Sequence, residues 1–175
     1  EGRLTMSSVP GRGTTIALDL PTTIATSRGL LVSIGAGKML WPFDAVERAI
    51  GVPKGDIESS LARGTYAYRG EALPIGPLAG ILGFETPSAP LNEHRLSPAI
   101  VVRSAGRRGI LLVDEVLGES EVVMKELRAP LQRIRNVMTT GLLGTGELVL
   151  VARPSDVIAS IRGGTHSTVK PADAE

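Results

Sequence analysis

The sequence has no cysteine among its 175 residues and only five aromatic side chains. The absence of thiols excludes disulfides, thiolate catalysis and zinc–thiolate sites. A surface that stacks nucleobases needs several exposed rings, and a formal net charge of +1 provides no basic excess for phosphates. A small barrel that binds single-stranded nucleic acid therefore stays only as an alternative, which a gel shift at low salt would test.

The sequence also has no apolar run long enough to cross a bilayer. Its longest runs, such as Ile110 to Val113, are typical of buried strands. With 42% hydrophobic and 21% charged residues, the composition is that of a folded domain. The chain starts with Glu1 and shows no signal-peptide pattern, so we interpret it as a piece of a longer polypeptide.

Residues that could carry chemistry are few and scattered. The two histidines, His94 and His166, have no neighbours at the spacing of a catalytic triad, and we expect them to be exposed bystanders. Adjacent carboxylates such as Asp114 and Glu115 point to opposite sides of a strand. The glycine-rich stretches 11–14 and 141–146 lack the lysine of a phosphate-binding loop. We therefore predict no catalytic, cofactor-binding or metal-binding residue.

Short β-branched runs separated by 21 glycines and 12 prolines indicate many brief strands. Residues 3–7 and 14–20 alternate polar and apolar side chains around the Val9–Gly13 hinge, which predicts a hairpin. Because two strands alone cannot bury a core, this hairpin is expected to belong to a larger sheet.

Two sequence landmarks then recur in the same order, which suggests a duplicated unit, although a chance match of strand–turn–strand patterns is the alternative. The first landmark is a strand, a turn and a second strand: it occurs as Leu30–Ile34 and Lys38–Phe43, and again as Ile100–Arg103 and Gly109–Val113. The second landmark occurs as Gly70–Ile75 and again as Gly146–Val151. Short helical stretches are expected to follow the second landmark, over Pro77–Leu82 and Pro154–Ile161. Each unit would hold about five strands, which favours an all-β fold of two small barrels.

Four motifs in this order resemble the CheA family of chemotaxis histidine kinases. Residues 11–25 are similar to the end of the family's ATP-binding domain, and Tyr68–Ile75 to its Arg-Gly-Glu-x-Leu-Pro segment. Residues 112–125 are similar to its Val-Asp-x-Leu-x-Gly and Val-Val-x-Lys pattern, and Leu142–Gly146 to its glycine turn. Thr145 stands where the family has aspartate, and residues 151–154 depart from its Ile-Val-Asp-Val segment, so the local charge pattern differs from that of the family.

The resemblance implies two tandem SH3-like five-stranded barrels, forming a CheW-like regulatory domain over residues 28–162 with units at about 28–84 and 98–162. Residues 1–25 would be the terminal strands of an α/β ATP-binding domain. The proline-rich, polar composition of residues 85–98 independently predicts the inter-unit link, and the small, polar composition of residues 163–175 predicts a flexible linker. ATP and Mg²⁺ would belong to the missing catalytic domain, so this fragment would not be an enzyme. A free-standing CheW-like scaffold adaptor is the second reading, which the strand pair at residues 1–25 disfavours.

The implied function is control of autophosphorylation in two-component signalling. The implied partners are a CheW-like adaptor, chemoreceptor cytoplasmic tips and the kinase domain of the same chain. The first unit of this domain would dock against the second unit of the adaptor. The location would be cytoplasmic, at membrane-associated receptor arrays, without membrane insertion or nucleic acid.

From strand-end position and chemistry, we predict partner-binding residues in both units. Aromatic and arginine side chains are enriched at interface centres. The candidates are Tyr66, Tyr68 and Arg69 in the first unit and Leu142 and Leu143 in the second. A structural salt bridge by Arg69 fits the sequence equally well.

Overall fold

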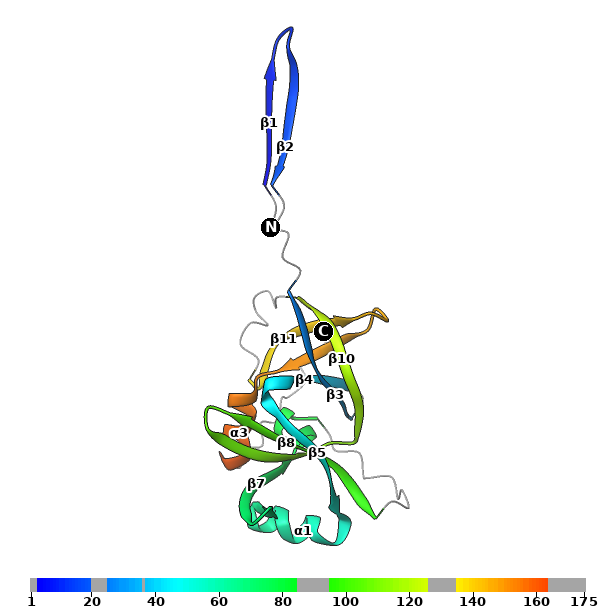
Figure 1. The fold of residues 1–175 in the computed structure, drawn as a ribbon, viewed down its shortest axis with the longest axis vertical. Helices are drawn as coiled ribbons and strands as arrows, with labels where there is room; N and C mark the ends of the chain where they lie inside the picture. Colours follow the sequence, from blue (N-terminus) through cyan, green and yellow to red (C-terminus); the bar gives the residue numbers. More distant parts are fainter. Residues whose placement is uncertain (1–2, 20–24, 36, 85–94, 126–134, 164–175) are drawn as a thin grey trace, which may run out of the picture.

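The computed structural model describes residues 3–19, 25–35, 37–84, 95–125 and 135–163. Within this part of the chain, strands dominate and helices are short (Figure 1). Both histidines, Ala36 of the first expected turn, residues 85–94 of the link and residues 164–175 of the tail lie outside the described residues.

The predicted N-terminal hairpin is present. Strand β1 (Arg3–Val9) pairs antiparallel with β2 (Gly13–Asp19), and Gly11 adopts the positive φ angle that the tight turn needs. Alternation along the two strands places four apolar side chains on one face, all 59–67% exposed: Leu4, Met6, Ile16 and Leu18.

The described residues between 26 and 163 form the remaining strands, three short α-helices and one 3-10 turn. In chain order these are β3 (Thr26–Ile34), β4 (Gly37–Pro42), η1 (Phe43–Ala45), β5 (Val46–Pro53), α1 (Lys54–Arg63), β6 (Thr65–Tyr68), β7 (Glu71–Pro77), α2 (Leu78–Leu82), β8 (Leu96–Ser104), β9 (Arg107–Leu112), β10 (Glu115–Lys125), β11 (Val137–Leu143), β12 (Leu148–Ala152) and α3 (Pro154–Gly163).

The ten strands form two five-stranded units, which confirms the predicted all-β fold. One unit is a closed barrel in the order β10-β11-β12-β4-β3. The other is a curled half-barrel in the order β5-β8-β9-β7-β6, in which β5 and β6 do not pair with each other. Each unit contains one parallel pair, β12 with β4 in the barrel and β7 with β9 in the half-barrel. Around the closed barrel the order is β10-β11-β12-β4-β3, and the equivalent strands of the other repeat follow one another around the half-barrel as β5-β6-β7-β9-β8, with the β5–β6 pairing missing. The two strand orders therefore match, as the sequence repeat predicts.

The predicted boundaries of the units need a correction, because the two repeats exchange strands. The barrel combines β3 and β4 of the first repeat with β10 to β12 of the second, and the half-barrel combines β5 to β7 with β8 and β9. Residues 28–84 and 98–162 each contain five strands, but neither segment is one unit.

The exchange follows from the links β4–β5 and β9–β10. Each link is at most three residues long, and none of its residues has the positive φ angle of a tight hairpin turn. The chain therefore continues forward into the other unit. Asp114 fixes the second link, because its side chain accepts a hydrogen bond from the backbone N–H of Gly35 and its own N–H donates to Ser33.

The largest core lies between the two units and holds them together. It contains Trp41, which is fully buried, and draws side chains from both units and from α2 and α3: Val32, Ile34, Met39, Leu78, Ile100, Val102, Leu111, Val113, Val137, Ala152, Val157 and Ile158. A smaller cluster fills each unit, around Val101 in the half-barrel and Val151 in the barrel. Because the units share a close-packed core, surfaces that cross their boundary keep a fixed shape.

Asn136 ties α2, α3 and the start of β11 together. Its backbone has φ of 69°, and its side chain is 5% exposed. The Asn136 amide donates to the carbonyl oxygen of Ile81 at 3.3 Å and accepts from the Ser160 hydroxyl at 2.9 Å, while its own carbonyl accepts from the N–H of Arg153.

Helix α1 was not anticipated from the sequence. It connects β5 to β6 and packs on both strands, on the side where the half-barrel is open. It ends at Gly64, whose φ of 70° allows its N–H to bond back to Leu61. The two helices that were predicted, α2 and α3, are present after the second landmark of each repeat.

Candidate protein-docking site

A groove of about 880 Å³ lies where the two units meet. It is bounded by the start of β3, the β4–β5 link, the β8–β9 hairpin, the end of β10, the start of β11 and the first residue of α3. Both repeats contribute residues to the lining. The groove therefore depends on the exchange of strands, which brings segments of the two repeats together.

The groove is mainly apolar, and two methionines from neighbouring strands lie in its lining together with Pro42 and Pro154. Met138 is 40% exposed and Met124 is partly buried. Met138 is the extra residue of a β-bulge, because β12 pairs with Val137 and then with Thr139. Bulges re-aim side chains at the rims of barrels. Methionine adapts its shape to a partner, so this lining suits an apolar ligand surface.

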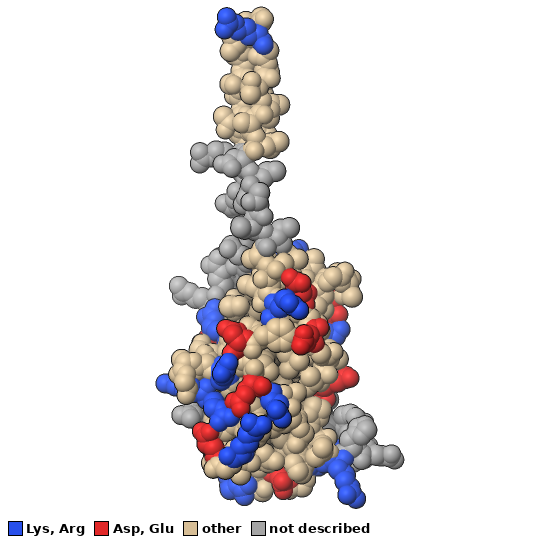
Figure 2. Space-filling model, in the orientation of Figure 1, with Lys and Arg blue, Asp and Glu red and all other residues tan. Residues whose placement is uncertain are grey.

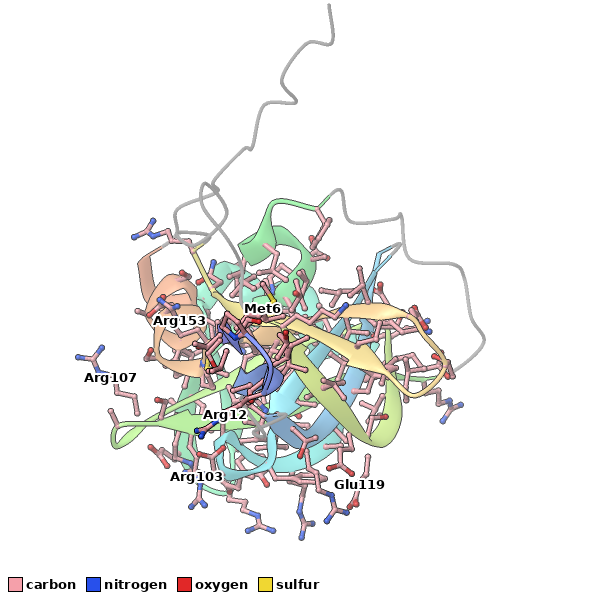
Figure 3. The ribbon with its side chains drawn as sticks, turned by 90° about the horizontal axis from the view of Figure 1, so that it is seen from above. Met6, Arg12, Arg103, Arg107, Glu119 and Arg153 are labelled. Carbon is pink, nitrogen blue, oxygen red and sulfur yellow. The ribbon has the colours of Figure 1, made fainter. Side chains whose placement is uncertain are left out.

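Basic residues border the groove on the β8–β9 hairpin. Arg103 and Arg107 line it, against one acidic lining residue, Asp44. Arg103 donates to the backbone oxygen of Asp44 at 3.3 Å, and Arg107 forms no ion pair with any described residue. Figure 3 shows both arginines on one side of the molecule together with Arg153, which precedes α3. This border favours an acidic partner.

A third arginine of the groove, Arg108, belongs to a charge cluster at the end of the half-barrel. Its guanidinium donates to both carboxylate oxygens of Glu47, at 2.9 and 2.7 Å, and also pairs with Glu71. The hydrogen bond to Glu47 raises the pKa of Arg108 above its ordinary value. Glu47 is the extra residue of a bulge in β5, at the repeat position equivalent to Leu117 in β10. In Figure 2, basic and acidic side chains are interleaved over the lower part of the molecule, where Figure 1 shows the half-barrel.

The structure brings the three predicted residues of the first unit together. Tyr66 and Tyr68 both lie on β6 and pack partly against the core of the half-barrel. The guanidinium carbons of Arg69 and Arg108 lie 5.5 and 5.8 Å from the centre of the Tyr68 ring, which is cation–π distance. Arg69 is exposed, has a φ of 51° in the turn after β6 and forms no ion pair with any described residue.

The two predicted leucines of the second unit face opposite ways. Leu143 packs against the core of the barrel, opposite Val122. Leu142 faces outward in a cross-strand row with Val123 on one side and Leu148 on the other. Val123 is 38% and Leu148 is 62% exposed, so this outer row is an apolar surface of the barrel.

Sequence reasoning missed the groove and its residues Met124, Met138, Arg103 and Arg107. The residues lie on strands that are distant in the sequence, and no motif connects them. Among the described residues, no group of acidic side chains could hold a metal ion, and no helix is both long and apolar enough to cross a membrane.

Two strand-exchanged five-stranded units around a shared core, with an open groove, define a two-barrel protein-interaction module. Residues 28–162 match the family described as the CheW-like domain, and the chain belongs to that family. The crystal structure of the scaffolding protein TtCheW from Thermoanaerobacter tengcongensis has a similar fold. Its TM-score is 0.56 at 15% identity, over 74% of this chain and 90% of that one.

Relatives that match over a longer stretch include two chemotaxis proteins and a gliding motility regulatory protein. The chain is 32% identical over 170 residues to the chemotaxis protein CheA of Cereibacter sphaeroides, covering 95% of this chain and 24% of the relative. It is 31% identical over 152 residues to CheA of Salmonella typhimurium, covering 86% and 22%. It is 30% identical over 167 residues to a gliding motility regulatory protein of Myxococcus xanthus, covering 92% and 20%. The chain thus spans about a quarter of these relatives or less.

Proposed function

We propose that this chain is the regulatory domain of a CheA-like chemotaxis sensor histidine kinase. It docks to a CheW-like adaptor and to chemoreceptor tips, and thereby controls autophosphorylation by the kinase domain of the same chain. It acts by binding, in the cytoplasm at membrane-associated receptor arrays. The support is membership of the CheW-like family together with likeness to CheA proteins over as much as 95% of the chain.

We assign the β1–β2 hairpin to the end of an ATP-binding domain. The likeness to CheA of Cereibacter sphaeroides extends over 170 residues, beyond the 28–162 segment of the CheW-like domain. The exposed apolar face formed by Leu4, Met6, Ile16 and Leu18 also suits a place in a larger sheet. A free-standing adaptor is the second candidate, favoured by the fold of the TtCheW scaffolding protein. Translation of the full gene separates them, because a kinase has phospho-acceptor, dimerisation and ATPase domains upstream.

The groove is the proposed site for a receptor tip, and its shape and charge carry this part of the proposal. An amphipathic helix with one apolar and one acidic side fits a groove with an apolar lining and a basic border. The apolar side would contact Met124 and Met138, and the acidic side would meet Arg103 and Arg107. The receptor tip is therefore proposed to be an acidic amphipathic helix.

The adaptor is proposed to bind elsewhere, on the predicted residues of the two units. Arg69 offers an exposed guanidinium held over the Tyr68 ring, which is suited to a carboxylate of the adaptor. Leu142 lies within the exposed outer row. Leu143 supports this surface from inside the barrel, so its replacement by aspartate would disturb folding.

Three variants test the proposal and control one another. Met138→Asp places a charge in the groove and should weaken binding of a receptor cytoplasmic fragment by at least about tenfold, with adaptor affinity unchanged. Leu142→Asp and Arg69→Ala should weaken adaptor binding, with receptor affinity unchanged. Titration calorimetry measures both affinities, and circular dichroism checks the fold. Unchanged affinity for both partners in all three variants would contradict the proposal.

A further inference from the structure

The four methionines are the only sulfur-containing residues of this chain, because it has no cysteine. They differ widely in exposure. Met39 is fully buried in the core between the units, Met138 is 40% exposed and Met6 on the hairpin is 67% exposed, with Met124 partly buried. Oxidation of sulfur by peroxides requires access to the side chain. Within residues 26–163, this access exists at Met124 and Met138, and both line the groove.

Neither groove methionine belongs to the packed cores. Met138 projects from a bulge, where the ladder between β11 and β12 is already interrupted. An added oxygen at this position therefore meets solvent rather than the protein interior. We expect the fold to tolerate this modification, and the surface of the groove to change from apolar to polar.

From this arrangement we propose that Met138, assisted by Met124, is a site of reversible oxidation that releases a partner from the groove. The oxidant is hydrogen peroxide or another hydroperoxide. A lone pair of the thioether sulfur attacks a peroxide oxygen, the O–O bond breaks and an S–O bond forms. The sulfur loses two electrons and becomes the sulfoxide. The proton on the transferred oxygen passes to the second peroxide oxygen, which leaves as water from hydrogen peroxide or as an alcohol from an alkyl hydroperoxide. A methionine sulfoxide reductase reverses the change.

The effect on binding rests on the proposed function of the groove. A docked apolar surface removes water from Met138, and the sulfoxide oxygen then loses its hydrogen bonds to water. The cationic donors on the border of the groove, Arg103 and Arg107, are those proposed to meet the acidic side of the partner. Burying an unpaired polar group is unfavourable, and we expect the affinity to fall about tenfold.

The chemical part of the proposal is tested without any partner. The chain is treated with graded hydrogen peroxide, and peptide mass spectrometry follows the oxidised fraction of each methionine. Met138 should oxidise at least about ten times faster than the buried Met39, with Met124 in between and no change in circular dichroism. Oxidation of Met39 at the rate of Met138, or unfolding that accompanies Met138 oxidation, would overturn the inference.

The functional part uses a Met6→Leu background, so that the hairpin cannot contribute. Peroxide should lower the affinity for an acidic receptor-tip fragment about tenfold, and sulfoxide reductase should restore it. Additional Met138→Leu should make the affinity largely resistant to peroxide. If Met138→Asp weakens binding but peroxide does not, the oxidation switch is wrong while the docking proposal stands. If Met138→Asp has no effect, the docking proposal fails first, and the switch fails with it.

Discussion

Replacement of Gly29 by alanine tests the close approach of β3 and β4. A Cβ atom at this position would lie 2.1 Å from the carbonyl oxygen of Trp41 and 3.1 Å from Cγ of Leu40, whereas ordinary contacts begin at 3.4 Å. Because the clash is with backbone, the strands would have to separate by more than about 1 Å at the Gly29–Pro42 pair. Such overpacking, with the loss of one or two ladder hydrogen bonds, costs about 3 kcal/mol.

Urea unfolding followed by the fluorescence of Trp41, the only tryptophan, measures this loss. A decrease of about 3 kcal/mol in the free energy of unfolding corresponds to a thermal midpoint about 6–12 °C lower. Gly55→Ala is the matched control. Gly55 lies in α1 with no atom near its missing Cβ, so alanine there should stabilise the protein by about 0.5–1 kcal/mol. Equal stability of Gly29→Ala and the wild type would refute the strand pairing described for the barrel.

Three further predictions concern contacts that connect separate elements of the fold. Asn136→Ala should lower the free energy of unfolding by about 2–3 kcal/mol, because it strains a left-handed residue and removes two side-chain hydrogen bonds; Asn136→Gly should recover only the backbone part. Arg108→Ala should speed hydrogen exchange of the β6 amides, because Arg108 connects Glu47 and Glu71 beneath the ring of Tyr68, and unchanged exchange would argue against this role. Deletion of residues 1–24, which keeps Ala25 as the acceptor for the N–H of Met124, should leave the thermal midpoint of the remaining chain unchanged, and a marked decrease would show that the hairpin supports the barrels.

Much of the fold follows from short-range sequence signals. Alternation around a glycine turn predicts the β1–β2 hairpin, and the repeated landmarks predict the equivalence of β3–β4 with β8–β9. The exchange of strands depends instead on the direction in which two short links leave their strands. Neither Phe43–Ala45 nor Val113–Asp114 carries a sequence pattern that indicates this direction. The repeat is therefore visible in the sequence, while the division into units is not.

The candidate sites likewise include features that the sequence predicts and features that only the structure reveals. Strand alternation requires that one of Leu142 and Leu143 faces the core, but only the register with β10 and β12 decides which one. The position of Met138 depends on a bulge, a local feature that has no marker in this stretch of sequence. Arg69 and Tyr68 are adjacent in the chain, so their proximity could be predicted, whereas the approach of Arg108 to the same ring could not.

The most direct test of groove docking uses the four methionine methyl groups as probes. The chain is labelled with ¹³C at the methionine methyls and titrated with a receptor cytoplasmic tip fragment, and each methyl signal is followed by NMR. If the groove is the docking site, the signals of Met138 and Met124 shift or broaden, while those of Met39 and Met6 stay in place. Perturbation of Met6 alone, or of none of the four at a saturating concentration of a bound fragment, would contradict the account.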